Sequence, residues 1–182
     1  LTSADILYAG IGTAYMSSKK LDEFVNALLK DDISSNVDVD AIIGCFAEDP
    51  GPAQLDEFRD LIDVVFGENT IEDIFDHLSI IDHNWAKETV AVLKKMSPIS
   101  LKIIIEQLRR GGKLDFDDCM KMEYRIVCAI SSYDSDFYEG VRAVLIDKDH
   151  NPSWIPVSLE EVKTDMVMAH FNIPDEGEDL EL

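Results

Sequence analysis

The feature that most constrains this chain is the spacing of its apolar residues, which recur at intervals of three and four along nearly the whole length. This spacing places apolar side chains on one face of an α-helix. Clear examples are residues 21–29, 55–65 and 101–108. Helices of this kind bury one face each against a common core. We therefore predict a mainly α fold.

One segment departs from the helical period. Residues 11–16 read Ile-Gly-Thr-Ala-Tyr-Met, and β-branched and aromatic side chains favour strands. We predict one short strand here, near the N-terminus. A strand needs a neighbour that pairs with its backbone groups, and no convincing partner follows in the sequence. The unpaired strand indicates that a further part of the protein precedes Leu1.

Residues that cap helices mark where the elements begin. Thr2 with Asp5 forms a capping-box pattern, and Ser158 with Glu161 forms another before a predicted last helix. Ser97 followed by proline predicts the start of a helix. A short helix is predicted at 40–47 and is followed by a Pro-Gly-Pro break at 50–52. Asp134 or Ser135 opens a further helix.

The charge balance excludes several partners. The 182 residues include 16 Lys and Arg against 37 Asp and Glu, which gives a net charge of −21. Nucleic acid is disfavoured because its phosphates need basic side chains, and an anionic membrane surface is disfavoured for the same reason. No apolar run approaches the roughly 20 residues that cross a bilayer. Three cysteines without a pairing pattern indicate free thiols in a reducing compartment.

No self-contained active site is visible in the sequence. Gly10 and Gly12 begin a phosphate-loop pattern, but Tyr15 stands where the third glycine belongs. Residues 147–151 begin a calcium-loop pattern that fails at its glycine and its bidentate glutamate. The four histidines lack zinc-ligand spacing and are interpreted as surface residues or helix caps. The failed calcium loop and the histidine spacing lead us to predict no metal site. Nothing in the sequence separates a catalytic carboxylate from a solvated one.

A resemblance changes this interpretation. Residues 96–102 read Met-Ser-Pro-Ile-Ser-Leu-Lys, and residues 122–125 read Met-Glu-Tyr-Arg. Residues 136–149 read Asp-Phe-Tyr-Glu-Gly-Val-Arg-Ala-Val-Leu-Ile-Asp-Lys-Asp, and Asn-Pro-Ser-Trp follows at 151–154. These segments resemble the C-terminal half of the 3-hydroxyisobutyryl-CoA hydrolases, a branch of the enoyl-CoA hydratase/isomerase (crotonase) superfamily. Residues 1–11 resemble the segment that closes the catalytic domain of that family.

The resemblance implies where the chemistry lies. In crotonase-type enzymes the oxyanion-hole glycines and catalytic carboxylates belong to an N-terminal α/β core, and no position here matches them. No catalytic residue is therefore assigned in this chain, and the catalytic residues are expected upstream of Leu1. The resemblance makes Lys148 the candidate for binding CoA phosphates, against the alternative of a solvated lysine between two aspartates. Arg142 is expected in an internal ion pair with Glu123 or Glu139.

The resemblance also implies an organisation. Residues 1–30 would end the catalytic core as helix, short strand and helix, and 31–53 would be an acidic linker with a short helix. Residues 54–174 would be a C-terminal helical region, and 175–182 a loose acidic tail. The expected partners are the N-terminal catalytic core and an acyl-CoA substrate, without a separate cofactor. A homo-oligomer is left open, because a subunit interface can contribute to CoA binding in this superfamily.

The expected parent reaction is hydrolysis of 3-hydroxyisobutyryl-CoA in valine breakdown, with this chain inactive alone. Two alternatives stay open: a hydratase or isomerase of the same superfamily, and a non-enzymatic acidic helical module that binds basic partners. The compartment would be the cytoplasm in a bacterium, which we prefer, or the mitochondrial matrix in a eukaryote.

Overall fold

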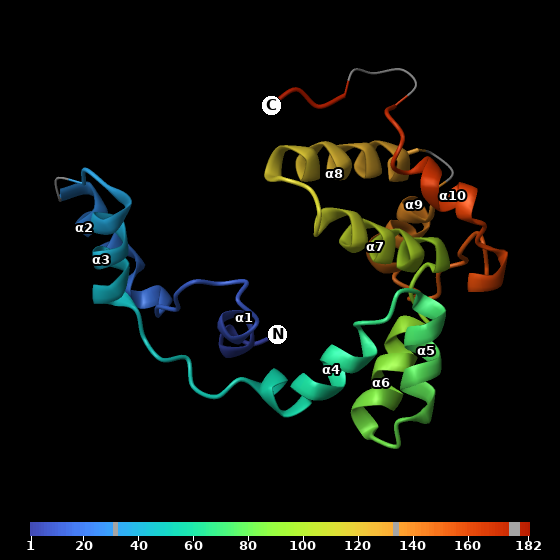
Figure 1. The fold of residues 1–182 in the computed structure, drawn as a ribbon, viewed down its shortest axis with the longest axis horizontal. Helices are drawn as coiled ribbons and strands as arrows, with labels where there is room; N and C mark the ends of the chain where they lie inside the picture. The colour runs from blue at the N-terminus through green and yellow to red at the C-terminus, as the bar shows by residue number, and fades with distance from the viewer. Residues whose placement is uncertain (31–32, 133–134, 175–178) are drawn as a thin grey trace. The chain divides into compact units, whose positions relative to one another are not determined.

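The structure, a computed structural model, describes residues 1–30, 33–132, 135–174 and 179–182. These residues form two compact units, residues 1–64 and residues 65–182, which are described separately below. Both units are built from helices (Figure 1). The predicted helix start at Asp134, residues 31–32 of the predicted linker and residues 175–178 of the predicted tail lie outside the described residues.

The first unit begins with a helix whose start was predicted correctly. Its elements are α1 (Ser3–Tyr8), η1 (Ser18–Lys20), α2 (Leu21–Lys30), α3 (Asn36–Phe46), η2 (Gln54–Phe58) and most of α4 (Arg59–Val65). The capping box of Thr2 and Asp5 is present, with the Asp5 backbone N–H donating to the Thr2 hydroxyl at 3.2 Å. The second carboxylate oxygen of Asp5 accepts from the Leu55 backbone N–H at 2.9 Å. Asp5 therefore ties α1 to η2.

The predicted strand at 11–16 is wrong, since none of the described residues forms a strand. The backbone groups of this segment find other partners. The N–H groups of Ile11 and Gly12 both donate to the Ile6 carbonyl at 3.1 Å, which closes the C-terminus of α1. Gly10 makes this turn with a φ of 73°, a conformation that suits glycine. The Tyr15 carbonyl accepts from the Glu48 N–H at 2.8 Å, so this end of the segment is bonded to the residues after α3 and not to a second strand.

Helices α2 and α3 lie side by side in the first unit (Figure 1). Phe24 of α2 and Phe46 of α3 form an edge-to-face pair, with ring centroids 5.5 Å apart. The amine of Lys20 lies 2.5 Å from the carboxylate of Glu48. Helix α3 begins at Asn36, earlier than the predicted 40–47, because Ser35 and Asp38 form a capping box.

The second unit holds two hydrophobic clusters. Its elements are α5 (Ile71–Ile80), α6 (Asn84–Leu93), α7 (Pro98–Gly111), α8 (Phe116–Ile130), α9 (Asp136–Val141), the π-helical turn η3 (Arg142–Ile146), η4 (Leu159–Glu161) and α10 (Thr164–Ala169). One cluster gathers Ile74 and Leu78 of α5 with Ala86 of α6. Helix α7 reaches both clusters, with Leu101 in the first and Ile103 in the second. Side chains two positions apart on a helix point in directions about 200° apart, so one helix can contribute side chains to both clusters.

The start of the last helix was predicted incorrectly. Ser158 opens η4, without a side-chain capping bond, and α10 begins later with Lys163 at its N-cap. Val162 explains the break, because it is buried in the second cluster with an extended backbone. The predicted start at Ser97 is confirmed, since its hydroxyl accepts from the Ser100 N–H at 3.2 Å. Among the described residues, no helix has the length and apolar character needed to cross a membrane.

Candidate functional site

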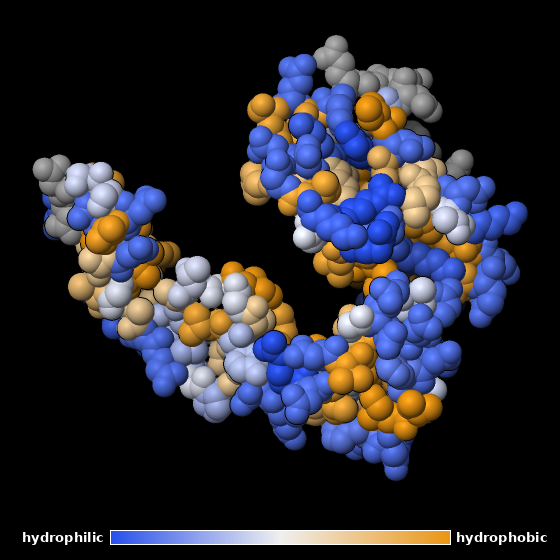
Figure 2. Space-filling model, viewed as in Figure 1, coloured by the Kyte–Doolittle hydropathy of each residue, from blue (hydrophilic) through white to orange (hydrophobic). Residues whose placement is uncertain are grey.

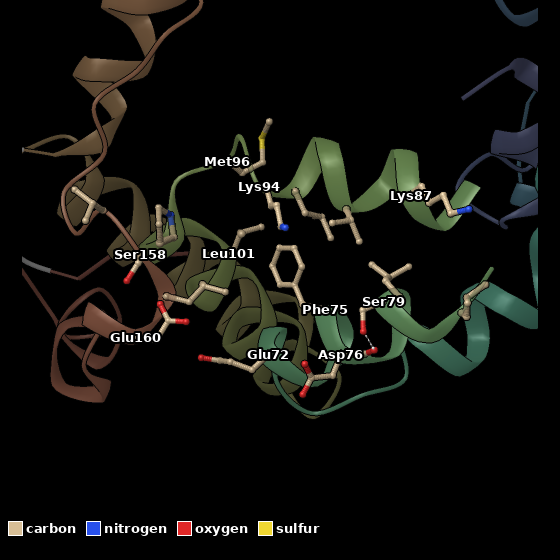
Figure 3. Close-up of a pocket in the computed structure, with 17 residues that line it drawn as sticks. Glu72, Phe75, Asp76, Ser79, Lys87, Lys94, Met96, Leu101, Ser158 and Glu160 are labelled. Atoms are coloured by element: carbon tan, nitrogen blue, oxygen red, sulfur yellow. Dashed lines mark hydrogen bonds between the residues drawn. The ribbon is translucent and has the colours of Figure 1, made fainter. Parts of the chain in front are cut away.

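A cavity of about 710 Å³ in the second unit lies between α5, α6, the start of α7 and the segment around Ser158. Apolar side chains of Phe75, Leu93 and Leu101 line it. Figure 3 shows Lys94 and Phe75 pointing into this space from opposite sides, with Glu72 and Glu160 at its edge. The cavity can hold an apolar group beneath a rim of mixed charge.

Two of the polar residues that line this cavity have partners close by in the sequence. The hydroxyl of Ser79 donates to the Asp76 carbonyl at 2.7 Å. The pKa of Glu160 is lowered, first by a hydrogen bond from the Ser158 side chain. Glu160 is therefore held in its charged form at the edge of an apolar space.

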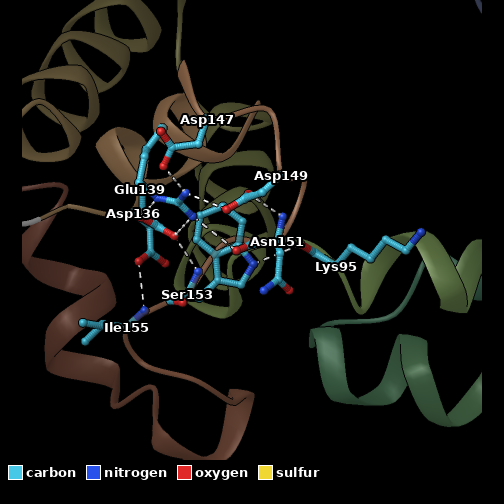
Figure 4. A network of polar contacts seen from close by, with 10 residues as sticks. Lys95, Asp136, Glu139, Asp147, Asp149, Asn151, Ser153 and Ile155 are labelled. Carbon is cyan, nitrogen blue, oxygen red and sulfur yellow. Dashed lines mark hydrogen bonds and ion pairs between the residues drawn. The ribbon is translucent and has the colours of Figure 1, made fainter. Parts of the chain in front are cut away.

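The most elaborate polar cluster centres on Arg142, at the start of η3 (Figure 4). Its guanidinium donates two hydrogen bonds of 2.8 Å to Glu139. The same group donates to Asp147 and to Asp149, each at 2.7 Å. Glu139 also accepts from the Ser153 backbone N–H at 2.7 Å. The predicted ion pair of Arg142 with Glu139 is confirmed, and Glu123 instead accepts from Gln107.

The cluster around Arg142 holds its groups charged. The hydrogen bond from Arg142 lowers the pKa of Glu139 to about 2, and it also lowers the pKa of Asp149. The pKa of Arg142 is raised, first by Glu139. Bidentate pairing of this kind fixes geometry as well as charge. The cluster therefore fixes the loop from Asp147 to Asn151 in place.

Lys148, the predicted substrate-binding residue, lies in this loop and is exposed. Its backbone φ is 55°, and that of His150 is 53°, both in the left-handed region. Such a conformation costs roughly 1–2 kcal/mol for a residue with a side chain. The two aspartates beside Lys148 in the sequence, Asp147 and Asp149, form their ion pairs with Arg142. Within the described ranges, the Lys148 amine has no ion pair.

The other patterns noted in the sequence have structural roles. His83 is the N-cap of α6 and accepts from the Trp85 backbone N–H at 3.1 Å. Asp147 and Asp149, which begin the incomplete calcium-loop pattern, form ion pairs with Arg142. The three cysteines are free. The part of the chain that the structure describes holds no group of three or more His, Cys, Asp or Glu residues suited to a metal ion.

Sequence reasoning identified one of the three acidic partners of Arg142. Glu139 lies three residues before Arg142, on the same helical face. Asp147 and Asp149 come from the loop after η3, where helical spacing gives no guidance. Their pairing with an arginine could have been suspected from the acidic loop closely following it. The cavity has no local signal, because residues from 72 to 160 line it.

The comparisons place this chain in a family. The family model for enoyl-CoA hydratase/isomerase matches residues 1–171. The chain belongs to the enoyl-CoA hydratase/isomerase family. The predicted resemblance to the 3-hydroxyisobutyryl-CoA hydrolases is also confirmed. A mitochondrial protein of that name from Gallus gallus is 37% identical over 92% of this chain and 44% of its own length. The one from Homo sapiens is 35% identical over 94% of this chain and 45% of its own.

A solved structure agrees with this assignment. A carnitinyl-CoA dehydratase from Mycobacterium thermoresistibile superposes with a TM-score of 0.79. It is 34% identical to this chain and covers 95% of it, while the match covers 48% of the dehydratase. The chain spans about half the length of the curated relatives it matches.

Proposed function

We propose that this chain is the C-terminal half of a CoA-thioester hydrolase, and that the whole enzyme converts 3-hydroxyisobutyryl-CoA and water into 3-hydroxyisobutyrate and CoA, as in valine breakdown. In this reaction water adds oxygen to the acyl carbon, the C–S bond breaks and the CoA thiol leaves. The observation that carries the proposal is the match of relatives of that name to more than nine-tenths of this chain at 35% and 37% identity.

The proposal gives this half a binding and supporting role. The groups that stabilise the thioester oxyanion would lie in the part of the relatives' length that this chain does not span. Acyl-CoA would be the substrate, with CoA entering as part of it and no separate cofactor. Lys148 would contact a CoA phosphate, because its amine is exposed and Arg142 takes up the neighbouring carboxylates. The ion pairs of Arg142 with Asp147 and Asp149 fix the backbone of the loop that carries Lys148.

An uncovered apolar face in the first unit supports a covering partner. Helices α2 and α3 contain no buried residue. Leu21, Val25 and Leu29 form one stripe on α2 and are 51%, 43% and 78% exposed. A helix with an apolar stripe is stabilised by whatever covers that stripe. We propose that the catalytic part of the same enzyme covers it, and that any homo-oligomer forms through the assembled enzyme.

In this proposal, the cellular compartment of the enzyme depends on the organism from which it comes. The relatives from Gallus gallus and Homo sapiens are named mitochondrial. We propose the mitochondrial matrix if the source is a eukaryote and the cytoplasm if it is a bacterium.

A second candidate function is hydration or dehydration of an acyl-CoA. It is favoured by the match to the carnitinyl-CoA dehydratase, with its TM-score of 0.79. The two reactions differ in the bond that changes. Hydrolysis releases a free thiol, whereas hydration removes the carbon–carbon double bond of an enoyl-CoA and leaves the thioester intact. A thiol reagent therefore separates them directly.

The decisive experiment joins this chain to the part of the Gallus gallus hydrolase that it does not match. We expect the fusion to release thiol from 3-hydroxyisobutyryl-CoA and to leave crotonyl-CoA unhydrated. The 182-residue chain alone should release none, and turnover by that chain would refute the division of roles. Hydration without thiol release would establish the second candidate. Folded fusion with neither activity would favour a non-enzymatic module.

Two matched pairs of variants in the fusion test the assigned roles. Lys148→Ala should raise KM about threefold to fivefold with kcat unchanged, as expected for one exposed charge contact. Lys163→Ala, another exposed lysine of the same unit, is the control. Leu29→Gln should weaken the assembly of the two halves, whereas Leu108→Gln, at 68% exposure, should not. Equal effects within either pair would contradict that role.

A further inference from the structure

A second cavity of about 400 Å³ lies between α7, α8 and Phe171. Nine residues line it, and five of them are cationic: Arg109, Arg110, Lys113, Lys121 and Arg125. We call this cavity the basic pocket. The whole chain has 16 Lys and Arg against 37 Asp and Glu, so this concentration of positive charge runs against the composition. In Figure 2, strongly hydrophilic residues gather where α7 and α8 lie.

The positive charge of the basic pocket is only partly neutralised by its surroundings. Glu106 accepts from Arg109 and Arg110, at 2.6 Å to each. The carboxylate of Asp118 forms a longer ion pair with Lys121, at 3.5 Å. Within the described part of the chain, Lys113 has no ion pair. Among the described residues, the five cations have three acidic partners, Glu106, Asp118 and, for Arg125, Asp179, so two positive charges are left without a matching negative charge.

The floor of the basic pocket holds a guanidinium in a fixed orientation. The centre of the Arg110 guanidinium lies 4.1 Å from the centroid of the Phe171 ring. Nη2 of Arg110 also lies 2.9 Å from the sulfur of Met168. Phe171 and Met122 are buried beneath the charges, at 5% and 6% exposure. Stacking on an aromatic ring pre-orients an arginine, which lowers the entropy cost of binding an anion.

The basic pocket already binds an anion from a distant part of the chain. Arg125 and Asp179 form a two-pronged ion pair, in which Arg125 Nε donates to Asp179 Oδ1 at 3.0 Å. Asp179 lies 54 residues further along the sequence. The pKa of Asp179 is lowered, first by this hydrogen bond, so the carboxylate is charged when bound. A carboxylate held in this way stands in for one oxygen pair of a phosphate group.

We propose that the basic pocket binds the phosphate groups of a small anionic molecule, and that the carboxylate of Asp179 competes with this ligand for Arg125. Of the other four cations, Lys113 has no ion pair in the described part of the chain, while Arg109, Arg110 and Lys121 share the two acidic partners Glu106 and Asp118. A diphosphate suits the pocket, because its charge and several oxygens can engage more than one cation at once. The source can be free phosphate or a nucleotide. The pocket shares no residue with the Arg142 cluster, so this inference does not rest on the proposed hydrolysis.

The test is calorimetric titration of the full 182-residue chain with inorganic pyrophosphate at low salt. We expect saturable binding at one site. Lys113→Gln should weaken binding about threefold to fivefold, as for one exposed charge contact. Asp179→Asn should strengthen binding by a similar factor, since Arg125 is released. Lys163→Gln removes one positive charge elsewhere on the same unit and should leave the affinity unchanged.

A parallel titration with ADP separates the two sources. Tighter binding of ADP than of pyrophosphate supports a nucleotide ligand that uses the apolar floor, and equal binding supports recognition of the phosphates alone. Absence of binding overturns the proposal. An equal loss in the Lys113→Gln and Lys163→Gln variants also overturns it, because the attraction would then come from general charge. An unchanged affinity in Asp179→Asn overturns the competition.

Discussion

Ser97 joins the start of α7 to the start of α9, and its loss should cost far more stability than an ordinary serine substitution. Its hydroxyl oxygen accepts from the Ser100 N–H at 3.2 Å, and its O–H donates to Asp136 Oδ2 at 2.5 Å. Asp136 also accepts from the Ile155 backbone N–H at 2.9 Å, as Figure 4 shows. One hydroxyl therefore connects three segments of the second unit, and Ser97 is only 6% exposed.

The expected effect of Ser97→Ala follows from two contributions. Loss of a helix N-cap costs about 1 kcal/mol. Loss of a hydrogen bond to a charged group costs roughly 1.5–3 kcal/mol, and the lower end applies here because Asp136 is half-buried. The sum is about 2.5 kcal/mol in the free energy of unfolding. With a urea dependence of about 2 kcal/mol per molar, the midpoint should fall by about 1.2 M.

Tryptophan fluorescence during urea unfolding measures this change, because both tryptophans, Trp85 and Trp154, lie in the same unit as Ser97. Ser100→Ala is the matched control, since no side-chain hydrogen bond is found for Ser100 in the described part of the chain. It should change stability by less than about 0.5 kcal/mol. A double-mutant cycle with Asp136→Asn should give a coupling of about 1 kcal/mol or more. Equal effects of the two serine substitutions would refute the reasoning.

Three further predictions concern the core, a turn and an acid. Ile74 is 0% exposed, so Ile74→Ala should lower stability by about 3 kcal/mol and Ile74→Val by about 1 kcal/mol, both measured by urea unfolding. Gly10 has a φ of 73°, so Gly10→Ala should destabilise by about 1 kcal/mol. Gly44→Ala is its control and should stabilise slightly in thermal unfolding, because Gly44 lies within α3 and a Cβ there meets nothing within 4 Å. The Asp5 pKa is lowered from 3.8 to about 2, mainly by the Thr2 backbone N–H, so folding keeps the carboxylate charged. This contribution to stability is present above pH 4 and should fall away as the pH drops from about 4 to 2. NMR titration of Asp5 should give a pKa near 2, an ordinary value would contradict the assignment, and Asp5→Asn should remove this part of the acid sensitivity.

Signals between near neighbours predicted much of the fold. Three features could be predicted from the sequence: the capping box of Thr2 and Asp5, the helix start at Ser97, and the pairing of Arg142 with Glu139. Each depends on residues no more than four positions apart, where helix geometry fixes which groups meet. The family could also be recognised from the sequence, because residues 136–154 contain a long run of residues specific to that family.

The wrong secondary-structure predictions lie where contacts with other parts of the chain override the local sequence pattern. Residues 11–16 have strand-like side chains, yet backbone groups at both ends of the segment bond to Ile6 and Glu48, and no strand forms there. Ser158 and Glu161 match a capping box, yet burial of Val162 ends η4 before a longer helix can grow. Propensity is worth little against the burial of a large apolar side chain.

By itself, the sequence determined a helical chain, the starts of α1 and α7, and its family. Only the tertiary structure decided that Asp147 and Asp149 share Arg142, and that five cations surround one cavity. The pairing of Arg125 with Asp179 likewise spans 54 residues. The physical reason is one of range: local geometry is set by neighbouring residues, whereas a site depends on which distant surfaces the hydrophobic clusters bring together.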